Sequence, residues 1–207
     1  MRTWARAAAA LLALAGTVLL AWIGITLVWG EPFTAIETAR AQESLNRELD
    51  RRDSAWTVRA QASRDQRALA FGRELRPGDA LGRLEIPRLG LRVVVVEGTS
   101  AEELARGPGH YPTTPLPGLG GTVAVAGHRT TYSQPFRHID ELRAGDRVVL
   151  TTPYGRFRYA VYGRKIVDDR DWSIVRPRPF EQIVLTACHP LYSAAQRIAV
   201  FARLTAV

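Results

Sequence analysis

Residues 147–167, RVVLTTPYGRFRYAVYGRKIV, are the stretch that decides the fold class. Two runs rich in Val, Thr, Tyr and Phe, residues that favour strands, flank Pro153-Tyr154-Gly155. Pro and Gly form turns, and two strand-like runs joined by such a short turn predict a β-hairpin. The C-terminal half of the chain is therefore expected to contain an antiparallel pair of strands.

Short strand-like runs lie on both sides of this hairpin. LGRLEIPRLGLRVVVVEG (81–98) predicts two strands separated by Gly90, and GTVAVAGH (121–128) predicts a strand that ends at a histidine. EQIVLTACHP (181–190) and QRIAVFARLTA (196–206) predict the last two strands. About eight short strands indicate an all-β barrel or sandwich.

Only short helices interrupt this β pattern. SAEELARG (100–107) predicts a helix with Ser100 as its N-cap and Glu103 three residues later. PFRHIDELRAGD (135–146) predicts one or two helical turns. Between them, GPGHYPTTPLPGLGG (107–121) is too rich in Gly and Pro for regular structure and predicts a loop.

The uncharged run AAAALLALAGTVLLAWIGITLVW (7–29) predicts a transmembrane helix. As a helix it is about 35 Å long, enough for the roughly 30 Å hydrocarbon core of a bilayer. It is too long for the apolar part of a cleaved signal, and a buried core helix is the other alternative. Arg2 and Arg6 precede it. The positive-inside rule therefore predicts a single-pass protein of the cell membrane, with a cytoplasmic N-terminus and everything after Gly30 outside.

The chain accordingly divides into three predicted parts: residues 1–30 with the anchor, a linker at 31–78, and a folded domain at 79–207. Within the linker, AIETARAQESLNRELDRRDSAW has helix propensity, with Leu45 and Leu49 four residues apart, but few large apolar residues. It predicts a partly helical or disordered stalk that lifts the domain off the membrane.

The formal net charge of +8 does not indicate nucleic-acid binding. The arginines are scattered, without a basic run, an RNA-binding motif or zinc-finger spacing, so a solvated basic surface near an anionic membrane or wall is favoured. Cys188 is the only cysteine, so the chain cannot form an internal disulfide.

That cysteine lies at the end of a predicted strand, in LTACHP. His128 ends another predicted strand, and Arg197 opens the strand after Cys188. The connection HPLYSAAQ is short, so neighbouring strands would bring Cys188 and Arg197 together. A guanidinium beside a thiol favours the thiolate and can donate to an oxyanion. With His128 as acid or base, these residues could form a thiol catalytic site.

Each of these residues also has a purely structural interpretation. A lone cysteine in an apolar strand is more often inert core, since free cysteine is among the most buried residue types. His189 is a rival base, but alternation along a strand turns it away from Cys188. No metal is predicted: a zinc site would have to combine Cys188 with histidines at 110, 128 and 189, whose spacing fits no zinc-binding signature.

Three motifs, AVAGHR, LTACHP and AQRIAVFARL, follow in this order behind the N-terminal anchor and resemble the sortases over roughly residues 81–205. The resemblance implies a sortase-type eight-stranded β-barrel and a membrane-anchored cysteine transpeptidase that needs no cofactor. It makes Cys188, His128 and Arg197 catalytic. The implied partners are surface proteins with a C-terminal sorting signal, cut between Thr and Gly through a thioester on Cys188, and the amine of a peptidoglycan precursor that accepts the acyl group.

The loop motif GPGHYPTTPLPG resembles class E sortases of high-GC Gram-positive bacteria, with class D the nearest alternative. In class E, a tyrosine in this loop is linked to a preference for Leu-Ala-x-Thr-Gly over Leu-Pro-x-Thr-Gly, and that role would fall to Tyr111. His110 and Thr186 would also line the substrate groove. Ala187 departs from the threonine that family members often carry before the cysteine, which removes a possible hydrogen bond to the substrate.

Two other interpretations stay open. Another cell-wall cysteine enzyme, such as an L,D-transpeptidase, usually shows Ser-His-Gly-Cys before an arginine, and LTACHP lacks that glycine. A membrane-tethered β-domain that binds wall polymer or a partner protein would keep Cys188 as inert core. The reactivity of the thiol distinguishes an inert cysteine from a catalytic one.

Overall fold

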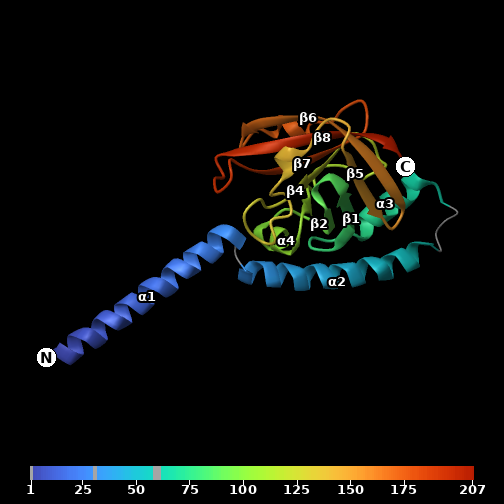
Figure 1. Ribbon diagram of the computed structural model, residues 1–207. Coiled ribbons are helices and arrows are strands. Elements are labelled where there is room, and N and C mark those ends of the chain that lie inside the picture. Colours follow the sequence, from blue (N-terminus) through green and yellow to red (C-terminus); the bar gives the residue numbers. More distant parts are fainter. Residues whose placement is uncertain (1, 30–31, 58–61) are drawn as a thin grey trace.

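The computed structural model describes residues 2–29, 32–57 and 62–207, and within them eight strands form a closed barrel (Figure 1). Neighbouring strands follow the order β1-β2-β3-β4-β7-β8-β6-β5. Their bounds are β1 Ala80–Ile86, β2 Leu91–Glu97, β3 Gly109–His110, β4 Thr122–Ala126, β5 Arg147–Thr152, β6 Gly155–Asp168, β7 Gln182–His189 and β8 Gln196–Ala206. The all-β barrel predicted from the sequence is confirmed.

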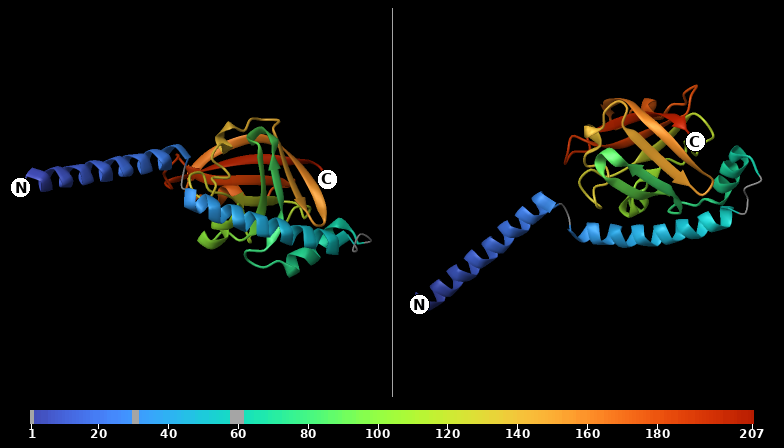
Figure 2. Two further views of the ribbon diagram at one scale, coloured as in Figure 1. Left: turned by 60° about the horizontal axis from the view of Figure 1, so that its bottom comes forward. Right: turned by 45° about the vertical axis from the view of Figure 1, so that its right-hand side comes forward.

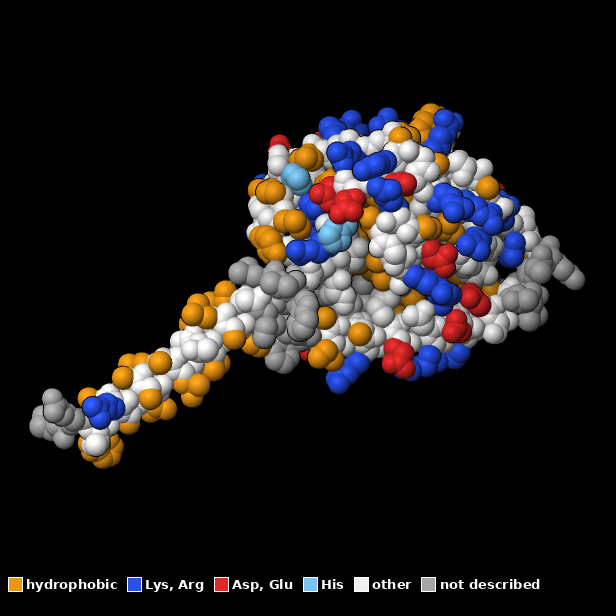
Figure 3. Space-filling view, viewed as in Figure 1, with side chains coloured by type: hydrophobic (Ala, Val, Ile, Leu, Met, Phe, Trp, Pro, Cys, Tyr) orange, Lys and Arg blue, Asp and Glu red, His pale blue; other side chains and the backbone are white. Residues whose placement is uncertain are grey.

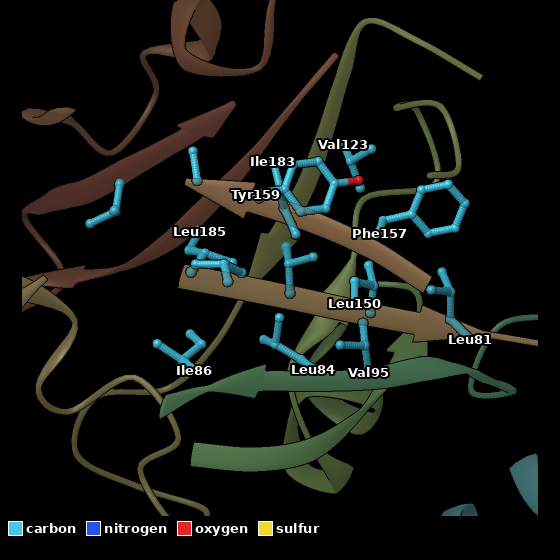
Figure 4. Close-up of a cluster of buried hydrophobic side chains, with 14 of the residues drawn as sticks. Leu81, Leu84, Ile86, Val95, Val123, Leu150, Phe157, Tyr159, Ile183 and Leu185 are labelled. Carbon is cyan, nitrogen blue, oxygen red and sulfur yellow. The ribbon is translucent and has the colours of Figure 1, made fainter. Parts of the chain in front are cut away.

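The predicted hairpin is formed by β5 and β6, with Thr152 opposite Gly155 across the turn. Successive side chains of a strand point to opposite faces, so every second residue in the first half of β6 enters the barrel. The buried ones are Phe157, Tyr159 and Val161. Figure 4 shows two of them in the interior among aliphatic side chains from other strands, such as Leu84, Val95 and Ile183.

Two parallel strands, β4 and β7, lie side by side in the barrel, with Val123 opposite Ile183 and Ala126 opposite Thr186. Because they run in the same direction, their C-terminal ends lie at the same edge of the sheet. β7 also pairs antiparallel with β8, so the end of β7 lies beside the start of β8. Residues from β4, β7 and β8 therefore meet at one edge of the barrel.

Helix α2 (Pro32–Thr57) lies along the barrel and does not project from it as a stalk (Figure 2). Leu45 and Leu49, which fall in the segment predicted to be a partly helical or disordered stalk, are 0% and 1% exposed, and they pack on the outer face of β1 and β2. The Gln42 side chain adds hydrogen bonds of 2.7 and 3.0 Å to the amide and carbonyl of Val94. A narrow leucine stripe is enough here because the strand surface that it covers is itself apolar.

Helix α3 (Arg64–Glu74) closes one end of the barrel. Its Phe71 is fully buried, and the Phe71 ring lies 5.5 Å from Trp56 of α2 and 5.4 Å from Tyr154 in the β5–β6 turn. Ser63 caps the helix: the Gln66 amide donates to its hydroxyl at 3.2 Å. Residues of the predicted linker thus contribute to the same hydrophobic core as the strands.

The short helices agree with the sequence in part. In α4 (Ala101–Arg106), the Ser100 amide donates to the Glu103 carboxylate at 2.6 Å, as a capping box requires. The helical turns predicted at 135–146 reduce to a 3-10 turn, η2 (Ile139–Glu141). Two further 3-10 turns are η1 (Pro87–Leu89) and η3 (Trp172–Val175).

Helix α1 (Arg2–Trp29) extends away from the barrel in Figure 1. Among the described residues it alone contains a stretch, Thr3–Gly24, that is long and apolar enough to cross a membrane. Figure 3 shows hydrophobic side chains along α1, whereas charged side chains gather over the barrel. This apolar helix fits membrane anchoring.

Candidate active site

The start of β8 places Arg197 opposite Cys188, as the short connection between the strands predicts. In the antiparallel register of β7 and β8, Cys188 pairs with Arg197 and His189 pairs with Gln196. Directly opposed residues lie on the same face of a sheet, with Cβ atoms about 5 Å apart. Nη1 of Arg197 donates to the carbonyls of Ala194 and Gln196 at 2.8 and 2.9 Å, so the loop backbone holds its guanidinium at this edge.

His128 reaches the same edge from β4. The strand ends at Ala126, two residues earlier than the sequence predicts, but the Gly127 amide donates to the Thr186 carbonyl at 2.9 Å. Pairing with β7 therefore continues beyond the end of β4. His128 follows Gly127, level with Cys188 on the neighbouring strand.

One cavity of about 290 Å³ unites these side chains. Cys188 is partly exposed, so its thiol is accessible from this side. The cavity walls include the three predicted catalytic residues and three of the predicted substrate-binding residues: Cys188, His128 and Arg197, and Tyr111, Thr186 and Ala187. These residues come from four different segments of the chain, and together they place a thiol, an imidazole and a guanidinium at one cavity.

The environment of His128 favours its neutral form. Burial lowers the pKa of the imidazole, because the charged form loses more solvation than the neutral one. Its Nε2 is buried and has no hydrogen-bond partner among the described residues. The ring lies 5.0 Å from that of Tyr132. A neutral imidazole with a free nitrogen can accept a proton from a thiol or an amine.

Tyr111 lines the cavity and contacts β7. Its hydroxyl forms a 3.1 Å hydrogen bond with Oγ1 of Thr186, two residues before the cysteine. Its ring packs edge-on against Trp172 of η3, with centroids 6.2 Å apart. Trp172 is 64% exposed and also lines the cavity, so the two aromatic rings form a partly open apolar wall.

His110 is the one predicted site residue that the structure does not bring to the cavity. It is 2% exposed, and its Nδ1 lies 2.7 Å from a carboxylate oxygen of Glu97. Its Nε2 lies 3.1 Å from Oγ1 of Thr114 and 3.3 Å from the carbonyl of Pro115. With both ring nitrogens occupied, His110 braces the loop that carries Tyr111.

The other two histidines face elsewhere. His189 turns away from the cavity, as strand alternation predicts, and its Nδ1 lies 3.3 Å from Nη1 of Arg129. His138 is exposed and pairs with Glu141 at 2.8 Å. Over the described ranges, no three His, Cys, Asp or Glu side chains come together in a way that could hold a metal ion.

The sequence analysis did not single out Trp172, which lines the cavity, or Arg129, which lies beside it. Trp172 lies in DDRDWSIV, which reads as a charged surface turn, and its only signal was a large aromatic residue among acidic neighbours. Arg129 follows His128 in AVAGHR and is buried. Nothing in the local pattern distinguishes it from the many solvated arginines of the chain.

Comparison with known proteins decides the family. A protein-family model described as a sortase domain matches residues 84–205, more than half of the chain. The chain belongs to the sortase family. The match covers β2 to β7, the last three residues of β1 and all but the final residue of β8, and it includes every residue assigned above to the cavity.

The similar sortases include proteins named sortase D and sortase E. Sortase D of Bacillus subtilis is 40% identical over 114 residues, which are 55% of this chain and 56% of that protein. Sortase SrtE1 of Streptomyces coelicolor is 31% identical over 176 residues, 72% of this chain and 50% of that protein. The chain thus spans about half the length of these curated relatives. The structure of sortase E from Streptomyces avermitilis has a TM-score of 0.58 and 35% identity, covering 63% of this chain and 91% of that one.

Proposed function

We propose that this sortase is a membrane-anchored cysteine transpeptidase with Cys188 as nucleophile, His128 as acid and base, and Arg197 as oxyanion donor. The observation that carries the proposal is the direct pairing of Cys188 with Arg197 at the edge of a cavity that His128 also lines. A nucleophile, a proton carrier and a cationic donor are the groups that acyl transfer through a thioester needs.

The first half of the reaction forms the acyl-enzyme. His128 takes the proton of the Cys188 thiol, and the sulfur attacks the carbonyl carbon of the Thr–Gly bond in a sorting signal. Arg197 donates hydrogen bonds to the resulting oxyanion. The C–N bond then breaks while His128 gives a proton to the leaving glycine amine. The products are a thioester on Cys188 and a peptide with a free amino terminus.

The second half returns the enzyme to its starting state. The amine of a cell-wall precursor attacks the thioester carbon, and His128 takes a proton from that amine. The C–S bond breaks, the sulfur of Cys188 takes that proton back from His128, and the surface protein leaves with a new amide bond. His128 needs to be neutral when the amine arrives, which agrees with the downward shift of its pKa by burial.

The substrate proposal rests on the wall formed by Tyr111. Its hydroxyl, bonded to Thr186, and its contact with Trp172 place an aromatic face beside the approach to the thiol. We assign the chain to the class E type, which implies a preference for Leu-Ala-x-Thr-Gly over Leu-Pro-x-Thr-Gly. Class D is the alternative, because sortase D of Bacillus subtilis has the higher identity over the shorter stretch.

The anchor proposal rests on the apolar stretch of α1. With Arg6 before most of this stretch, the N-terminus is cytoplasmic and the barrel lies on the outer face of the membrane. There the cavity can meet surface proteins during export and the amines of wall precursors. To test this topology, a reporter cysteine is introduced at one or the other end of α1, and intact cells are treated with a thiol reagent that does not cross the membrane. Only the reporter cysteine at the C-terminal end of α1 is expected to be labelled.

The decisive experiment uses the full chain in detergent micelles with quenched fluorescent Leu-Ala-x-Thr-Gly and Leu-Pro-x-Thr-Gly peptides and triglycine. Cleavage between Thr and Gly, with transfer to triglycine, is expected for the wild type and absent in Cys188→Ala. Arg147→Met, at an exposed position at the start of β5, is the control and keeps activity. If neither peptide is cut and iodoacetamide does not react with Cys188 in the folded protein, the barrel is a binding domain and Cys188 is inert.

A further inference from the structure

Arg129 is a buried cation beside two proposed catalytic residues. It follows His128 directly in the chain, and its side chain is only 2% exposed. Its charge is matched by Asp140, whose Oδ1 lies 2.8 Å from Nη2. Arginine is rarely buried unless it is paired and hydrogen-bonded, so this position has a specific use for a guanidinium.

Every N–H group of that guanidinium has an acceptor. Nε and Nη2 donate to the carbonyl of Arg137 at 3.2 and 3.1 Å, and Nη2 also donates to Asp140. Nη1 donates to the carbonyl of Cys188 at 3.5 Å and to Nδ1 of His189 at 3.3 Å. A guanidinium has five N–H donors and no acceptor, so this set is complete. Nδ1 of His189 must therefore accept, which places the proton of its neutral ring on Nε2.

These contacts join the two segments that carry the proposed acid–base and nucleophilic side chains. Arg137 belongs to the loop that follows His128, Asp140 to the 3-10 turn η2 at the end of that loop, and the carbonyl of Cys188 to the end of β7. The same loop is closed by the Phe136 amide, which donates to the His128 carbonyl at 2.9 Å. Arg129 is thus a bridge between the backbone around the imidazole and the backbone around the thiol.

The loop needs such a bridge because its backbone is strained. Tyr132, Ser133 and Gln134 have consecutive φ angles of 52°, 62° and 50°, in the left-handed region that is unfavourable for residues other than glycine. Strained backbone persists only where surrounding contacts hold it. Tyr132 is also the residue whose ring lies against His128, so a change in this loop reaches the imidazole.

We propose that Arg129 is a positioning residue that fixes the separation between His128 and Cys188. The inference rests on the proposed transpeptidase function. Arg129 is not among the described residues that line the cavity, so it acts through the backbone and not on the substrate. A planar fork of donors can reach both segments at once, whereas the ammonium of a lysine is a compact point donor that cannot span them.

The test compares Arg129→Met and Arg129→Lys with the matched control Arg147→Met, all in the full chain in micelles. Arg147 is exposed at the start of β5. Misplacement of a catalytic group by about 1 Å costs about 100-fold in rate, so kcat falls by about 100-fold in both Arg129 variants while KM stays within about twofold. Arg147→Met keeps wild-type values. Arg129→Lys keeps the positive charge but loses the fork of donors. If the role of Arg129 were purely electrostatic, Arg129→Lys would therefore keep the wild-type kcat.

A second readout needs no peptide. The rate at which iodoacetamide alkylates Cys188 is expected to fall in both Arg129 variants, since loss of the donor fork disturbs the thiol and its neighbouring base, and to stay unchanged in Arg147→Met. Near-UV circular dichroism identifies the fraction folded at the assay temperature, and rates are referred to that fraction. The proposal is overturned if folded Arg129→Met or Arg129→Lys keeps wild-type kcat and alkylation rates, or if its loss of activity only follows its unfolded fraction. A wild type that cuts no peptide refutes the transpeptidase function instead, and the alkylation rates still decide the role of Arg129.

Discussion

Replacing Leu45 with alanine measures how firmly α2 is bound to the barrel. Leu45 is fully buried, and its cluster contains Leu49 of the same helix and Ala80, Val94 and Val96 of the strands. Truncation of a buried leucine removes its transfer free energy and leaves a cavity, at a cost of about 2–5 kcal/mol. In a chain of about 200 residues each kcal/mol lowers Tm by about 2–4 °C, so a fall of about 4–20 °C is expected.

Thermal unfolding of the full chain in micelles, followed by near-UV circular dichroism, measures this shift. The control is Leu69→Ala in α3, where the leucine is 51% exposed and truncation costs about 0.5 kcal/mol or less. Limited proteolysis within residues 32–57 detects release of α2 before the barrel unfolds. If both variants have the same Tm as the wild type, and the protease cuts Leu45→Ala no faster, α2 does not pack on the barrel in solution. The segment is then a stalk, as the sequence predicts.

Two further predictions concern the cavity. Tyr111→Phe removes the hydrogen bond to Thr186, worth about 0.5–1.5 kcal/mol, so kcat/KM for the Leu-Ala-x-Thr-Gly peptide falls by about 2–13-fold. If neither Tyr111→Phe nor Tyr111→Ala changes the ratio of kcat/KM between the two peptides, Tyr111 does not set the preference. For His128, burial lowers the pKa in the folded state, so protons bind the unfolded chain more readily. The free energy of unfolding therefore falls as pH drops through the unfolded value near 6.5, and urea titrations at pH 7.5 and 5.5 show a smaller fall in His128→Gln. An equal fall in both proteins contradicts this assignment.

The sequence predicts the placement of Cys188 at the end of β7 and of Arg197 at the start of β8, because a short connection joins these two strands. Cys188 and Arg197 are separated by a short loop, and an antiparallel connection of that length leaves few registers, so their pairing follows from spacing. The alternation of side chains also turns His189 away from the thiol. The roles of these residues in catalysis stay predictions, since position alone does not measure reactivity.

The packing of α2 was not predicted, although a signal for it exists in a strand. The run VVVV at 93–96 gives β2 apolar side chains on both faces: Val95 enters the barrel, and Val94 and Val96 point outward. A strand that is apolar on both faces needs cover on both. Taken alone, the helix propensity of α2 and its Leu45–Leu49 pair are too weak to indicate a core helix. Leu45 and Leu49 are buried because the outer face of β2 offers them an apolar surface.

The orientation of His110 could not be predicted from the sequence, because its strand is too short to show alternation. The Gly/Pro-rich segment around it predicts a loop, and in a loop both His110 and Tyr111 can face a groove. In the structure Gly109–His110 is strand β3, in parallel pairing with β2, where His110 lies opposite Glu97. Adjacent residues of a strand point to opposite sides, so His110 turns to its carboxylate partner while Tyr111 turns to the cavity. The rule that separates His189 from Cys188 therefore also separates His110 from Tyr111, and it fails from sequence only because two residues are too short a strand to leave a periodic pattern.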